Sequence, residues 1–178
     1  KIGYLHLNYF IIEECPLVRP ERMEAIAQSL TGMALRLGCP SELFAPLWAE
    51  RADWFNTKPW RARWAVTAHE RLRLKCILDA CMAYMYGLNY EDFQWILLET
   101  DHPASFLASK KNTKSLDQKR FWRIDKGLDP ELRHTVLSQV AFHDLLERGI
   151  EEFLGKNDGD GWLIPDELRL AAFGLGRD

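Results

Sequence analysis

His143 and Asp144 are adjacent in the chain and form a pair of side chains that could bind a metal ion for phosphoester hydrolysis. A catalytic site of that kind needs further His and Asp ligands. His134 is nine residues earlier on the same predicted helix, so it lies on a different helical face. We therefore expect His143 to be a capped or solvated residue of an amphipathic helix.

The segment KNDGDGWLIPDE (156–167) resembles a calcium-binding loop with helices on both sides. Asp158, Asp160 and Glu167 stand at the third, fifth and twelfth positions of such a loop. Lys156 occupies the first position, where the cation requires a carboxylate, and its ammonium group would repel the ion. We expect this segment to be a structural Gly/Asp turn that caps two helices.

Basic and aromatic residues alternate between residues 51 and 64, and a second basic cluster follows in the polar segment 110–126, which holds seven basic residues and two acidic ones. Lys and Arg side chains on loops supply many of the phosphate contacts in protein–DNA complexes, although a solvated face over tryptophan core residues is an equally good interpretation of each single residue. The candidate DNA-binding residues are Lys58, Arg61, Arg63, Lys110, Lys111, Lys114, Lys119, Arg120, Arg123 and Lys126.

The sequence lacks the motifs of several common catalytic and cofactor sites. It contains no GxxxxGK[ST] phosphate loop, no GxGxxG and no GxSxG. No two prolines are adjacent, so the [DNS]PP[YF] motif of amino-methyltransferases is absent, as is an FxGxG methyl-donor loop. We therefore assign no catalytic, cofactor-binding or metal-binding residue to this chain and expect no cofactor in it.

The four cysteines do not form a CxxC pair, and no histidine stands near them at zinc-finger spacing. Cys76 and Cys81 fall within a predicted helix, where we expect buried thiols. Free thiols suit a reducing compartment, and no apolar run is long enough to span a membrane, so we predict a cytoplasmic protein.

The net charge of −3 conceals an asymmetry along the chain. Residues 51–126 carry 14 basic and 9 acidic groups, whereas residues 127–178 carry 5 basic and 11 acidic groups. A polyanionic partner should therefore contact the middle of the chain.

The elements that would position these residues are mainly helices. The spacing of apolar residues predicts helices over 21–37, 59–86, from Asn89 onward and over 129–154, with a possible bend at Gly149. The segment 77–86 is apolar on nearly every side, so we expect this helix to lie at the centre of the core. Gly87 should end it as a left-handed cap.

Residues 3–12 alternate as in a strand, and residues 121–124 could form another short strand. We expect a mainly α fold, an α+β fragment in which a helical bundle surrounds a central buried helix, with a minor β element near the N-terminus. The predicted division is a strand and linker at 1–19, left from an upstream domain, and a helical domain at 20–178 with a basic loop at about 101–127.

Four stretches resemble the C-terminal region of large adenine-specific DNA methyltransferases of restriction and phage-defence systems, of the type IIG, DISARM-like or BREX-like kinds. Two of them are LNYFIIEECPLVRPERM (7–23) and LRLKCILDACMAYMYGLNYEDFQWIL (72–97). The other two are RFWRIDKGLDPELRHTVLSQVAFHDL (120–145) and NDGDGWLIPDELRLAAFGLGRD (157–178). The YGL-x-x-eDF block is the most specific of these features.

The resemblance implies a parent enzyme that uses S-adenosylmethionine to methylate adenine N6 in duplex DNA after flipping the base. Its catalytic and methyl-donor motifs would lie N-terminal to Lys1. This chain would belong to, or follow, the target-recognition part, and the YGL block would serve helix capping and the core. No base-contacting residue carries over by motif.

Two hypotheses follow from these observations. The chain is either a part of the methyltransferase that contributes to DNA binding, or a helical docking scaffold within the same defence complex that never contacts DNA. The expected partners are duplex DNA, in the context of the full protein, and the upstream methyltransferase domain, with no membrane. If the strand 3–12 has lost its sheet, its edge could also pair with a neighbouring molecule.

Overall fold

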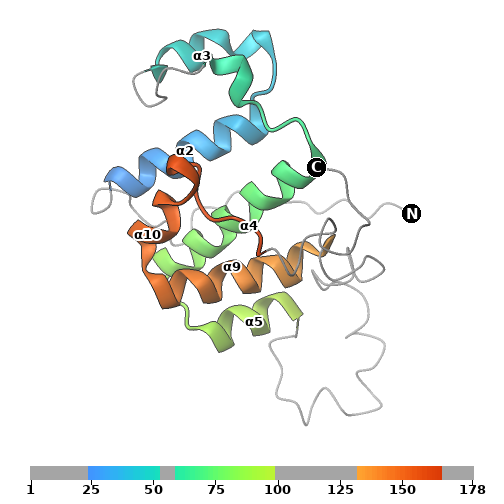
Figure 1. Ribbon diagram of the computed structural model, residues 1–178, viewed down its shortest axis with the longest axis vertical. Helices are drawn as coiled ribbons and strands as arrows, with labels where there is room; N and C mark the ends of the chain where they lie inside the picture. The colour runs from blue at the N-terminus through green and yellow to red at the C-terminus, as the bar shows by residue number, and fades with distance from the viewer. Residues whose placement is uncertain (1–23, 53–58, 99–131, 166–178) are drawn as a thin grey trace, which may run out of the picture.

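The computed structural model describes residues 24–52, 59–98 and 132–165 (Figure 1). These residues form helices and no strand, so the prediction of a mainly α fold is confirmed. The predicted strands at 3–12 and 121–124 and the predicted basic loop lie outside the described residues. The helical elements are α2 (Glu24–Gly38), η2 (Glu42–Phe44), α3 (Ala45–Ala49), η4 (Trp60–Arg63), α4 (Ala68–Met85), α5 (Tyr90–Leu98), α9 (His134–Arg148), α10 (Ile150–Gly155) and η6 (Asn157–Gly159).

Helix α4 lies at the centre of the described core, as the sequence predicted. It packs most extensively on α9, which also contacts α5 and α10, while α2 crosses α4 on another side (Figure 1). Leu74, Ile77 and Cys81 of α4 and Phe142 of α9 are completely buried. Burial of apolar side chains of this size typically contributes about 1.5–3 kcal/mol each, so the α4–α9 contact is the main apolar core of the described chain.

The start of α4 differs from the predicted helix over 59–86. Residues 60–63 form the short 3-10 helix η4, and Trp64 is extended, with ψ of 131°. Thr67 then begins α4, because its hydroxyl accepts a hydrogen bond of 3.1 Å from the backbone N–H of Glu70. The prediction of a continuous helix from Pro59 was therefore wrong, since this cap marks a helix start eight residues later.

The turn between α4 and α5 forms as the sequence predicted. Gly87 has a φ of +69°, and the N–H groups of Gly87 and Leu88 donate to the carbonyls of Tyr84 and Ala83, both at 3.0 Å. These two bonds make a Schellman motif, which ends the helix with its last carbonyls satisfied. Asn89 then caps α5 through a 2.8 Å bond from the backbone N–H of Asp92.

Gly149 separates α9 from α10, where the sequence predicted one long helix with a possible bend. Its φ of +82° and ψ of 159° are not helical, so the helix ends there. Residues with a Cβ atom rarely adopt this backbone conformation, whereas glycine adopts it readily. The turn after α10 also uses left-handed residues, because Asn157 and Asp158 both have a φ of +55°. This confirms the tight turn predicted at 157–161.

None of the described helices combines the length and the apolar character that a membrane-spanning helix requires.

We predict that Gly161→Ala destabilises the fold by about 2–3 kcal/mol. Gly161 has a φ of +85°, and an added Cβ would lie 3.1 Å from Cε of Met33 and 3.2 Å from Cδ1 of Ile77. The substitution therefore adds backbone strain to crowding in the core. Urea unfolding followed by circular dichroism measures the loss. Gly155→Ala is the matched control, because open space surrounds that glycine, and equal losses in both variants would contradict the packing described here.

Candidate functional site

The most connected polar group of the described chain is the guanidinium of Arg73, on α4. Residues three apart share a helical face, so Arg73 reaches Glu70 on the preceding turn. Its Nε donates to Oε2 of Glu70 and its Nη2 to Oε1, both at 2.9 Å. Its Nη1 donates to the carbonyls of Trp162 at 2.7 Å and Asp160 at 3.0 Å. Only 3% of Arg73 is exposed, so this charge is paired and hydrogen-bonded inside the protein.

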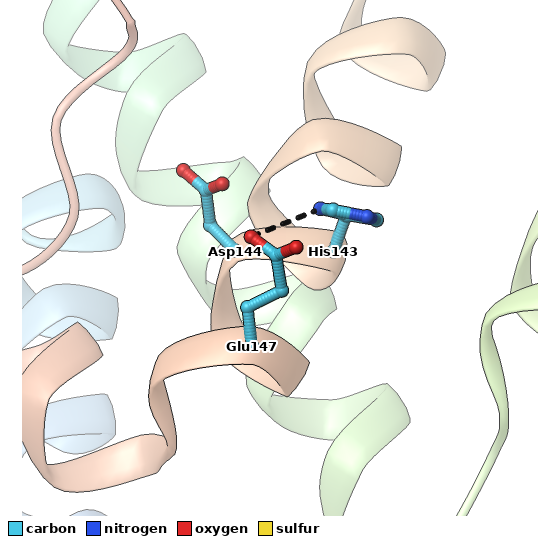
Figure 2. A group of neighbouring side chains, drawn as sticks. All are labelled: His143, Asp144 and Glu147. Atoms are coloured by element: carbon cyan, nitrogen blue, oxygen red, sulfur yellow. Dashed lines mark ion pairs between the residues drawn. The ribbon is translucent and has the colours of Figure 1, made fainter.

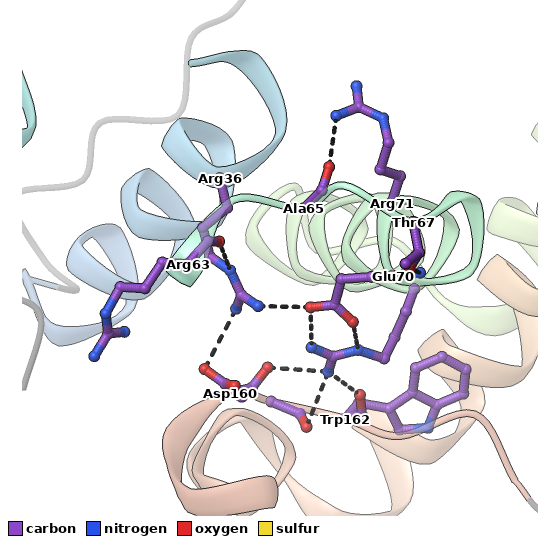
Figure 3. Close-up of polar contacts among 10 residues, drawn as sticks. Arg36, Arg63, Ala65, Thr67, Glu70, Arg71, Asp160 and Trp162 are labelled. Carbon is purple, nitrogen blue, oxygen red and sulfur yellow. Dashed lines mark hydrogen bonds and ion pairs between the residues drawn. The ribbon is translucent and has the colours of Figure 1, made fainter. Parts of the chain in front are cut away.

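Arg36, from α2, extends this arrangement (Figure 3). Its Nη2 lies 2.6 Å from Oε1 of Glu70, and its Nη1 lies 3.3 Å from Oδ1 of Asp160. Its Nε donates to the carbonyl of Arg63 at 3.0 Å. We call Arg36, Glu70, Arg73 and Asp160 the arginine–carboxylate cluster. It joins α2, α4 and the turn after α10, which are distant from one another in the sequence.

The cluster also sets the protonation state of Glu70. Burial alone would raise the pKa of this carboxyl, but the hydrogen bond and charge of Arg73, with the charge of Arg36, outweigh burial and hold the pKa below its ordinary value. Glu70 is therefore ionised at neutral pH and serves as a fixed anion between two guanidinium groups.

Two arginines near the start of α4, Arg71 and Arg73, bind groups of the protein itself. Arg73 is buried in the cluster. Arg71 donates from Nη1 to the carbonyls of Leu37 at 2.9 Å and Ala65 at 3.1 Å, which fastens the end of α2 to the segment before α4. These side chains donate hydrogen bonds to backbone carbonyls that lack a partner within a helix.

Arg61 is the most accessible of the predicted DNA-binding residues that the structure describes. Its side chain is 60% exposed, its Nη2 lies 2.8 Å from Oε1 of Glu42, and its guanidinium lies 5.3 Å from the ring centroid of Trp60. Surface ion pairs of this kind contribute little to stability, so Arg61 could exchange Glu42 for a phosphate at small cost. Arg63 is half-buried, and its carbonyl holds Arg36.

A tryptophan cluster supports Arg61. The ring of Trp60 lies 6.2 Å from that of Trp48 and 5.4 Å from that of Trp64. Trp48 is 1% exposed and donates from Nε1 to the carbonyl of Cys39 at 3.1 Å. The three rings therefore pack together, with Trp48 buried and Trp60 and Trp64 half-buried. The remaining candidates, Lys58, Lys110, Lys111, Lys114, Lys119, Arg120, Arg123 and Lys126, lie outside the described residues.

His143, Asp144 and Glu147 lie together on α9 (Figure 2). Their potential ligand atoms are within 4.8 Å of one another, and Nδ1 of His143 is 3.7 Å from Oε2 of Glu147. Asp144 also has a structural partner, because its Oδ2 accepts a 2.7 Å hydrogen bond from Nε1 of Trp162. This bond attaches the 157–162 turn to α9, and we assign no metal to the group.

The calcium-like turn is likewise engaged within the protein. Asp160 pairs with Arg36 through its carboxylate and with Arg73 through its carbonyl. The carboxylate that a cation would need at this position therefore already faces a guanidinium group. This arrangement favours the structural turn that the sequence predicted.

The described cysteines include two buried thiols, as predicted. Cys76 and Cys81 have no exposed surface, and burial raises the pKa of Cys81 to about 12. Cys81 stays protonated at neutral pH, and a protonated thiol is a poor nucleophile and a poor metal ligand.

A groove of about 580 Å³ opens between α4, α5 and the start of α9. It is largely apolar, and the sequence did not predict it. At one side, Nε2 of His134 lies 2.8 Å from Oδ2 of Asp79, and the hydroxyl of Ser138 donates a hydrogen bond of 3.3 Å to the same oxygen. The residues that line it are Leu72, Lys75, Asp79, Met82, Ala83, Tyr86, Leu88, Phe93, Ile96, Leu97, Leu132, His134 and Thr135.

Comparison of the chain with protein-family models, curated proteins and solved structures finds no match.

We predict that Arg73→Met lowers the free energy of unfolding by about 3 kcal/mol, because it leaves Glu70 partly uncompensated and the carbonyls of Asp160 and Trp162 without donors. Chemical denaturation at neutral pH measures this loss. Arg61→Met is the control, and we expect it to cost less than about 1 kcal/mol. Similar losses in both variants would contradict a special role for the buried arginine.

We predict that Glu70→Gln removes part of the pH dependence of stability. The folded-state pKa of Glu70 is depressed, so its contribution is complete above the ordinary value of 4.5 and is lost as the pH falls through the lower folded value. The difference in unfolding free energy between the native chain and the variant should therefore shrink on acidification. Unfolding titrations between neutral and acidic pH test this, and a difference that grows on acidification would refute it.

Proposed function

We propose that this chain is a non-catalytic C-terminal part of a bacterial adenine-N6 DNA methyltransferase from a restriction or phage-defence system, and that it contributes to duplex DNA binding. One observation carries the proposal. The stretches 72–97 and 157–178, which resemble that family, meet in the core where Arg73 holds the carbonyl of Trp162. A direct contact of this kind is expected if the two stretches belong to one structural unit.

The most specific block of the resemblance has structural roles in this chain. Gly87 ends α4, Asn89 caps α5, and Phe93 is buried against Phe142 at a ring distance of 4.8 Å. None of these roles requires a substrate. In this proposal, S-adenosylmethionine binding and adenine chemistry belong to other parts of the parent enzyme.

The charges on the described surface favour DNA contact near η4. Arg61 is exposed there, whereas Glu147, Glu151 and Glu152 are exposed on α9 and α10. Phosphates are attracted to the first region and repelled by the second. Of the ten candidate DNA-binding residues, seven lie in the basic segment 110–126.

A docking scaffold that never contacts DNA is the second candidate function. The observation that favours it is the apolar groove between α4 and α5, where Met82 and Ile96 are 39% and 47% exposed. Exposed apolar surface that forms a contiguous groove is typical of protein-binding sites.

Salt-dependent binding separates the two functions. We expect the chain to bind duplex DNA with an affinity that falls steeply with salt, because each phosphate contact adds about 0.9 to the slope of log affinity against log salt. The triple variant Lys110→Glu/Lys111→Glu/Lys114→Glu should reduce that slope by about 3, and Arg61→Glu by about 1. Fluorescence anisotropy with a labelled duplex measures both.

Arg148→Glu is the matched control, since Arg148 is an exposed arginine that is paired with Glu152, 3.0 Å away on the acidic side. It should leave the slope unchanged. Absence of binding at low salt would refute the DNA function and leave the docking scaffold.

A further inference from the structure

We draw no further inference here: the strongest candidate, the largely apolar groove between α4, α5 and the start of α9, carries none because nothing in the structure shows what covers it.

Discussion

The ion pair between the buried Arg73 and the half-buried Glu70 is the interaction on which the rest of the described structure depends. A guanidinium removed from water costs several kcal/mol unless its donors are satisfied, and here a carboxylate and backbone carbonyls satisfy them. The partners come from α4 itself and from the turn after α10. Arg36 adds α2 and the segment before α4 to the same cluster. These four segments must therefore adopt their positions together. Displacement of any one of them would leave hydrogen-bonding groups of the others without partners.

Trp162 transmits this constraint from the cluster to α9. Its carbonyl accepts from Arg73, and its indole N–H donates to Asp144. Its ring stacks on Phe153 at 6.3 Å with an interplanar angle of 21°. A short turn with several left-handed residues is thus held by contacts on three sides. The Gly and Asp residues of this turn therefore have structural roles. The turn lacks the carboxylate that a calcium ion requires at the first position of its loop.

The sequence allowed prediction of features that depend on neighbours along the chain. Gly87, Asn89 and Gly149 were located because caps and breaks are local, and the central position of α4 followed from its apolar composition. The burial of Arg73 could not be predicted in this way. Its carbonyl partners are 87 and 89 residues away, and a hydropathy pattern treats every arginine as a surface residue. Thr67 and Glu70 did carry a local signal for the start of α4, as a capping pair three residues apart.

In the proposed function, this helical unit contacts DNA through its basic middle, and its acidic end serves only the fold. Hydrogen exchange of the chain with and without duplex DNA tests that claim most directly, because it reports both faces in one measurement. The account predicts that DNA slows exchange in residues 59–63 and 110–126 and leaves residues 140–155 unchanged. Slower exchange in 140–155, or no change anywhere, would contradict it.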